Sequence, residues 1–386
     1  MAAPLPLVMA LRDYPLRQAQ RPTTDAAVYV GNLRGRLEAL DRRADRDSGA
    51  LLTMRASTTF ELYQIEGRLV LLDRAAALAK AAVTADPGVA DAWLIHAQIQ
   101  AHLHAFDGAL HALGRSEALK APQREVARLR TEIAAALGNL AADEHAAGPR
   151  TLANASDAIV AAHVCVQMGN LQCASELFHQ AQFLDNDPSP LPLAWLHTQQ
   201  GVTLLRFGHP EAAIPFFRAA LERLPGYYVA NEHLAECLGL IGAYDEARSH
   251  YEQVIAQTSH PEYMAGYAGM LRQAGDQDAA SEWQQRATDG YARLLESAPA
   301  AYAGHAIGFY LEAGNSSKAL NLAERNIAIR QDVGSWLLLA EARVAAGQCD
   351  GAVQALAKAK ATGWRPPEFA AATAAVNACS GTRQSG

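Results

Sequence analysis

The sequence predicts an all-α solenoid, a rod of stacked helical hairpins. Alanine is abundant and runs of β-branched residues are rare, which favours helices over strands. A glycine followed after four residues by an alanine recurs in the chain, and the successive alanines lie 39, 34, 33, 39 and 33 residues apart. A self-repeat with this period is typical of stacked hairpins. The pairs are Gly169/Ala174, Gly208/Ala213, Gly242/Ala247, Gly275/Ala280, Gly314/Ala319 and Gly347/Ala352.

The recurrence of small residues has a physical reason. Two helices can cross closely only where the side chains at the crossing are small. In most repeats a second small residue follows the alanine of the pair (the key alanine) and a third precedes it, as Ala220 and Gly201 flank Ala213. The glycine lies where the first helix ends, because a left-handed residue costs little without a Cβ atom. Asp245 and Glu246 then start a second helix, where acidic groups suit the helix dipole.

Residues 1–50 lie outside the repeat phase and form an N-terminal extension. We expect an extended segment from Met1 to about Thr24, followed by a helix from Ala26 to Arg46. Helical spacing places four apolar residues on related faces of this helix, and an open solenoid end needs such a cap. These residues are Val28, Leu33, Leu37 and Leu40.

Residues 51–190 continue the repeat toward the N-terminus. Ala75 and Ala109 lie 34 residues apart, in phase with the key alanines. The stretch of about 122–150 predicts a degenerate hairpin with its key alanine near Ala142, because no glycine is in phase and Pro149 replaces a small helical residue. The proline-rich stretch 187–192 predicts a loop that divides the array near residue 190.

Residues 191–386 hold the most regular repeats and a final helix. A second insertion around 297–299 also predicts a loop between hairpins. The stretch from Pro366 to Ala378 predicts a capping helix that covers the last hairpin.

Three stretches of the chain resemble the tetratricopeptide repeat family. They begin at Gly201, Leu234 and Ser335 and carry small, aromatic and leucine residues at the family's spacing. The resemblance covers roughly residues 55 to 380, and it implies a right-handed superhelical solenoid of about nine hairpins with N- and C-terminal capping helices. The matching positions are Gly201, Leu204, Gly208, Ala213, Phe217, Ala220, Pro225, Ala235, Leu238, Gly242, Ala247, Tyr251, Trp336, Leu339, Ala340, Gly347, Ala352, Leu356 and Ala359.

Charge and hydropathy argue against nucleic-acid binding and against a membrane span. The formal net charge is −7, whereas a nucleic-acid binder normally carries a basic stripe that neutralises phosphates. The short basic cluster of Arg42, Arg43 and Arg46 is mixed with aspartate, which is typical of a solvated helix face. No apolar run approaches the length of about 20 residues that crosses a bilayer. We therefore expect neither nucleic acid nor a membrane span.

Four of the five cysteines are expected to lie in two neighbouring pairs. Cys165 and Cys173 stand four residues before and after Gly169, so they face each other across a tight antiparallel turn. Cys349 opens the last repeat's second helix and Cys379 closes the antiparallel capping helix. Both pairs can reach the Cα separation of about 5.5 Å that a disulfide needs. The alternative is that these cysteines are simply small buried apolar residues.

The cysteines also bear on the compartment. Disulfides imply an oxidising compartment such as a bacterial periplasm, with Cys237 left buried and unpaired. Met1 to Tyr14 lacks a basic region and a clear cleavage site, so it does not resemble a signal peptide. We expect a periplasmic or exported protein whose leader has been removed, rather than a cytoplasmic protein.

Catalytic motifs are missing from the sequence. It has no phosphate-binding glycine loop, no HExxH motif and no nucleophile elbow, so we expect no enzyme, no catalytic residue and no cofactor. Four histidines cluster in sequence, but their spacing points them to different helix faces, and we expect structural roles for them. They are His96, His102, His104 and His111, with His104 at the turn position usually held by glycine.

The concave groove is the remaining candidate for a functional site. The first helix of each hairpin lines the inner surface of such solenoids, where ligands usually lie. This surface mixes acidic residues with histidine and lacks the Lys, Arg and Asn clamp of family members that bind the C-terminal carboxylate of chaperones. It favours a basic or metal-bearing ligand, or a peptide with exposed amides. The candidate groove residues are Trp195, Thr198, Glu232, His233, Glu236, Glu262, Arg272, His305 and Glu341.

The primary functional prediction is a non-catalytic scaffold that binds a protein or peptide in the groove, in the role of an assembly or export accessory factor. Two alternatives remain open. One is a bacterial cell-envelope protein that binds metal or matures a metalloprotein. The other is an enzyme or metal carrier that uses Glu232, His233 and Glu236, although no residue is assigned as a metal ligand by motif.

Overall fold

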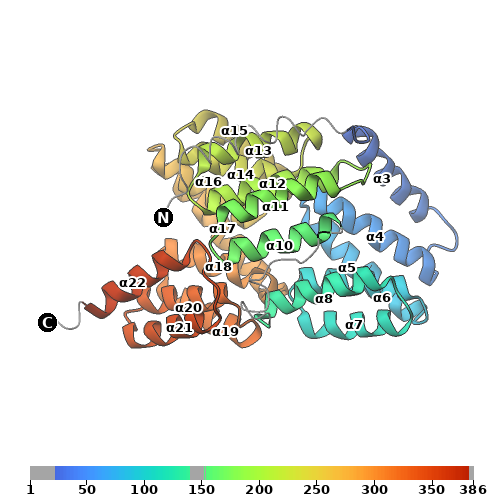
Figure 1. Ribbon diagram of the computed structural model, residues 1–386. Coiled ribbons are helices and arrows are strands. Elements are labelled where there is room, and N and C mark those ends of the chain that lie inside the picture. Colours follow the sequence, from blue (N-terminus) through green and yellow to red (C-terminus); the bar gives the residue numbers. More distant parts are fainter. Residues whose placement is uncertain (1–21, 140–151, 153, 382–386) are drawn as a thin grey trace.

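The described chain consists of helices arranged as consecutive antiparallel pairs (Figure 1). The computed structural model describes residues 22–139, 152 and 154–381, and over these residues it contains no strand. This confirms the predicted all-α repeat solenoid. The helices are α3 (Ala26–Asp41), α4 (Gly49–Glu66), α5 (Leu69–Ala85), α6 (Ala90–His102), α7 (Phe106–Ala118), α8 (Gln123–Leu137), α10 (Ala155–Gln167), α11 (Leu171–Leu184), α12 (Leu191–Arg206), α13 (Pro210–Arg223), α14 (Tyr228–Leu240), α15 (Tyr244–Thr258), α16 (Pro261–Gln273), α17 (Gln277–Ser297), α18 (Pro299–Glu312), α19 (Ser316–Ile329), α20 (Val333–Ala345), α21 (Cys349–Ala361) and α22 (Phe369–Gly381).

The turns of the hairpins form as the glycine pattern predicts. All six glycines of the repeated pairs have a positive φ, between 72° and 89°. At Gly208, for example, the next residue's N–H donates back to the Leu204 carbonyl over 3.0 Å, which satisfies an end group of α12. His104 has a φ of 54° and fills this position between α6 and α7, as predicted.

The key alanines lie at the helix crossings. Ala213, Ala247 and Ala319 have no exposed surface, and Ala280 retains 1%. The second small position is equally buried at Ala220. A larger side chain would push the paired helices apart, so these positions set how closely each hairpin closes.

The structure overturns one expectation about the irregular stretches and leaves another untested. The insertion around 297–299 forms no loop: α17 runs on to Ser297 and α18 starts at Pro299, because proline suits the first turn of a helix. The stretch 185–190 does lie between α11 and α12, but one apolar cluster joins Phe178 to Leu193 and Leu196 across it. The division into two halves at residue 190 stays a prediction.

Both ends of the array carry helices as expected. Leu33, Leu37 and Leu40 of α3 are buried, whereas Val28 is 54% exposed and lies off that face. The helix ends at Asp41 rather than at Arg46. At the other end, Phe369, Ala372 and Val376 of α22 are buried on the last hairpin. The predicted segment before residue 22, and Ala142 and Pro149 of the degenerate hairpin, lie outside the described residues.

The array curls back until its first hairpins touch its later ones (Figure 1). Gln331 N–H donates to the Leu137 carbonyl over 3.3 Å, and Arg365 N–H donates to the Gln167 carbonyl over 2.7 Å. Gln257 reaches the Glu66 carbonyl over 2.8 Å. These bonds join the ends of α4, α8 and α10 to segments almost 200 residues away in the sequence.

The close crossing of α12 and α13 can be tested at a helical glycine. A Cβ atom on Gly201 would lie 2.6 Å from the buried Phe217 ring, so we expect Gly201→Ala to destabilise the protein by about 1–3 kcal/mol. Gly269 is the matched control, because nothing lies within 4 Å of its Cβ position. Gly269→Ala should stabilise α16 by up to about 1 kcal/mol through helix propensity. Urea unfolding midpoints would measure both, and equal stabilisation would contradict the close crossing.

Candidate functional site

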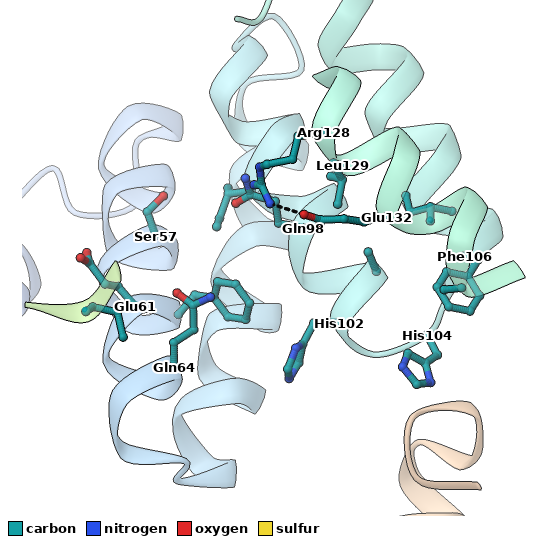
Figure 2. A pocket seen from close by; sticks show the side chains of 16 residues that line it. Ser57, Glu61, Gln64, Gln98, His102, His104, Phe106, Arg128, Leu129 and Glu132 are labelled. Carbon is teal, nitrogen blue, oxygen red and sulfur yellow. Dashed lines mark hydrogen bonds and ion pairs between the residues drawn. The ribbon is translucent and has the colours of Figure 1, made fainter. Parts of the chain in front are cut away.

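The inner surface of the N-terminal hairpins forms a groove of about 570 Å³. We call it the front groove; α4, α6 and α8 line it, and Figure 2 shows their side chains converging on it. Ser57, Glu61 and Gln64 follow one another at helical spacing on α4, and Gln98 faces them from α6. The groove is therefore framed by three inner helices rather than by a single loop.

Polar groups without partners distinguish the front groove. Among the described residues, no hydrogen bond is made by the side chains of Ser57, Gln64 or Gln98. Two charged residues of α8 are already engaged, since Arg128 bonds to Glu132 over 2.5 Å. The free amides and hydroxyl can both donate and accept hydrogen bonds, as a peptide backbone requires.

A second hollow, the central chamber, lies where the array closes on itself. It consists of two adjoining cavities of about 360 and 430 Å³, which share Glu232, His233, Glu262 and His305. The first hairpin contributes Tyr63 to its wall. His102 and His104 line both the chamber and the front groove, so the two hollows adjoin each other. Figure 2 labels these two histidines at the front groove.

Three side chains of α14 form the tightest cluster in the chamber. His233 Nδ1 lies 3.0 Å from a Glu232 carboxylate oxygen and 3.2 Å from one of Glu236. The Phe217 ring stacks on the imidazole at a centroid distance of 5.6 Å. Burial alone would lower the pKa of His233, but the carboxylates of Glu232 and Glu236 hold that pKa well above its usual value.

A second ion pair joins α16 to α18 in the same chamber. His305 Nδ1 lies 2.6 Å from Glu262, and His260 lies 3.8 Å from the other carboxylate oxygen. Burial would raise the pKa of Glu262, but His305 and its neighbours lower it to about 2. Glu262 in turn raises the pKa of His305. The His305 side chain keeps 56% of its surface open, so it projects into the hollow.

The structure brings five of the nine predicted groove residues together: Glu232, His233, Glu236, Glu262 and His305 all line one cavity. These residues lie close together because α14, α16 and α18 are equivalent first helices of successive hairpins and stack side by side.

The other four predicted residues lie elsewhere. Thr198 is fully buried and its hydroxyl donates to the Ala194 carbonyl within α12, so it is not available to a ligand. Trp195 packs near His163 in the cluster of α10–α12. Arg272 is exposed and bonds to Gln284. Glu341 lies beside Glu368 at the C-terminal end, where burial and that neighbouring charge raise its pKa.

The sequence did not predict that residues of the N-terminal hairpins line the front groove and the central chamber. Gln64, Gln98 and Tyr63 lie in hairpins that face the central repeats only because the array closes. His102 and His104 were expected to have structural roles on different faces, and both line the chamber. His96 and His111 instead flank Trp93. Repeat phase alone carries no signal for a contact between distant hairpins.

The two predicted cysteine pairs are formed. Cys165 bonds to Cys173 and Cys349 to Cys379, at Cα separations of 5.7 and 5.5 Å. Cys237 is free and buried, and burial raises the pKa of its thiol above the usual value. The first pair ties α10 to α11, and the second ties the capping helix α22 to α21.

Comparisons with known proteins agree with the repeat architecture. A tetratricopeptide repeat family model matches residues 204–270, which identifies this stretch as tetratricopeptide repeats. No curated protein matches the sequence. Within the described chain, none of the helices combines the length and apolar character needed to cross a bilayer.

Several solved structures of repeat proteins match the chain at low identity and with TM-scores below 0.5. The Cut9–Hcn1 hetero-tetramer of APC/C is 13% identical, with 88% of this chain and 63% of that chain covered and a TM-score of 0.49. A thermophilic tetratricopeptide repeat protein of Thermus thermophilus is 20% identical, with 48% and 98% covered and a TM-score of 0.39. YrrB, described as having an unusual peptide-binding site, is 18% identical, with 55% and 92% covered and a TM-score of 0.31.

The ion pair of Glu262 and His305 predicts a definite pH dependence. Because the pKa of His305 is raised, its stabilising contribution is complete below its ordinary pKa of 6.5 and is lost as the pH rises through the folded value. Because the pKa of Glu262 is lowered to about 2, its contribution is present above its ordinary pKa and is lost as the pH falls toward 2. NMR titration should place the His305 pKa above 6.5, and Glu262→Gln should lower it. An unchanged His305 pKa in that variant would contradict the pairing.

The cysteine pairing can be checked by thiol counting. Oxidised protein unfolded without reductant should expose a single reactive thiol, that of Cys237, and five after reduction. Cys237→Ser should abolish the signal before reduction. Five thiols in unreduced protein from its native compartment would show that neither bond forms there.

Proposed function

We propose that this tetratricopeptide repeat protein is a non-catalytic scaffold that holds an extended segment of a partner protein in the front groove. The observation that carries the proposal is the row of unpartnered polar side chains along α4 and α6. Ser57 and Gln64 are exposed and Gln98 is half-buried, so all three can reach a ligand.

The geometry of an extended chain suits these groups. Every residue of a peptide offers one N–H and one carbonyl, and those on one edge recur about every 7 Å. Side-chain amides can pair with both kinds of group, which gives affinity for backbone without demanding one sequence. Phe60 and Ile95 add apolar surface at the base of the groove. The closed array holds the three lining helices in place, so little ordering cost falls on the scaffold.

The two disulfides favour a role in an oxidising compartment, where such bonds persist. A scaffold there would act on proteins during export or assembly. In the groove Arg128 and Glu132 are paired with each other, and Glu61 accepts a hydrogen bond from Tyr29. These features support binding without chemistry.

The proposal predicts that the full chain binds linear peptides through the front groove. We expect a displayed library of random peptides to yield sequences that bind with micromolar affinity by fluorescence anisotropy. Gln64→Ala combined with Gln98→Ala should weaken that binding at least tenfold, since each lost hydrogen bond contributes about 1 kcal/mol. Ser57→Trp should block the groove sterically.

Gln253→Ala is the matched control, because Gln253 is exposed on α15, an outer helix. It should leave peptide binding unchanged. Failure to enrich any peptide, or equal binding by the control and the groove variants with unchanged melting temperatures, would overturn the proposal.

A further inference from the structure

The cluster on α14 places three metal-binding side chains around one point. Glu232, His233 and Glu236 each direct one donor atom inward, and these three atoms all lie within 4.8 Å of one another. Their spacing along α14 puts Glu232 and Glu236 one helical turn apart, with His233 between them. The cluster opens into the larger cavity of the central chamber.

The distances in the cluster fit a metal ion. Ligands about 2.1 Å from a metal lie about 3.0 Å apart at right angles and about 3.4 Å apart in a tetrahedron. The imidazole nitrogen lies 3.0 and 3.2 Å from the two carboxylate oxygens. The same atoms now form the hydrogen bond and ion pairs of the imidazole, so a metal ion would take the place of the Nδ1 proton between the two carboxylates.

Charge balance favours a dication as well. The proton on Nδ1 of His233 can neutralise one of the two flanking carboxylates, whereas a divalent ion neutralises both. The surrounding cavity adds Glu312 and the Glu262–His305 pair, and among the described residues no lysine or arginine lines it. The excess of negative charge is thus concentrated where the three donor atoms meet.

The site is held in place and open to ligands. Phe217, which is fully buried, stacks on the His233 ring and fixes its plane. Glu232, His233 and Glu236 retain 13%, 25% and 42% of their side-chain surface, so an ion can enter from the cavity. Three protein donors leave coordination positions free for water or for a group on the partner.

We propose that Glu232, His233 and Glu236 bind one divalent transition-metal ion in the central chamber. Two carboxylate oxygens and one imidazole nitrogen form a mixed donor set that suits Mn²⁺, Fe²⁺, Co²⁺ or Zn²⁺ better than Ca²⁺ or Cu⁺. The metal site shares none of its three ligands with the front groove, so the metal proposal and the peptide-binding proposal can be tested independently.

The test uses the full chain, stripped of metal with a chelator and freed of any affinity tag. Titration with Co²⁺, followed by its visible absorption, should show one saturable site, and Zn²⁺ should compete for it. His233→Ala should weaken Co²⁺ binding at least a hundredfold. Glu236→Gln, a change at the most exposed of the three ligands, should weaken it at least tenfold without affecting the fold.

His305→Ala is the matched control. His305 lines the same cavity but pairs with Glu262 and lies outside the cluster. It should retain one Co²⁺ site with an affinity within a few-fold of the parent chain. The double variant, Gln64→Ala with Gln98→Ala, should bind Co²⁺ with unchanged affinity while its peptide binding is weakened. That result would separate the metal site from the scaffold function.

Three results would overturn the metal site: no stoichiometric Co²⁺ or Zn²⁺ binding, equal loss in His305→Ala and His233→Ala, or binding that survives Glu236→Gln in a folded chain. Binding of a lysine-rich peptide at the cluster without metal binding would assign the chamber to organic cations instead, which also contradicts the proposal.

Discussion

The close crossing of helices at small side chains is the constraint from which the rest of the structure follows. Ala213, Ala247 and Ala319 have no exposed surface, because each lies where two backbones approach. The recurrence of this contact lets successive hairpins stack one after another. Stacked hairpins of this kind build a curved array whose inner surface is lined by first helices.

Closure of that curve turns an open surface into two bounded hollows. The hydrogen bonds of Gln331 to Leu137 and of Arg365 to Gln167 use backbone groups at helix ends, which would otherwise lack protein partners. The same approach brings Tyr63 and His102 opposite α14 and α16. The front groove and the central chamber are therefore products of long-range contact, not of any single repeat.

The two hollows differ in their chemistry, and this difference separates the two proposals. The front groove offers neutral amides and a hydroxyl, and its Arg128 and Glu132 are paired with each other, which suits the uncharged backbone of a peptide. The chamber concentrates carboxylates and imidazoles in a partly desolvated space. Charges in such a place are stabilised only by partners, so His233 and His305 are each held by neighbouring glutamates.

The sequence alone determined the hairpins, because their contacts are local. The glycine-to-alanine spacing placed the turns at Gly208 and Gly242, and the two cysteine pairs followed from the expected geometry of single hairpins. It also aligned Glu232, Glu262 and His305 on successive first helices. Only the tertiary structure decided that Gln64 and Gln98 face a groove, that Thr198 is buried, and that the N-terminal hairpins wall the chamber. The small rotation between hairpins accumulates along the array, and no local pattern encodes the point at which its sum brings distant helices into contact.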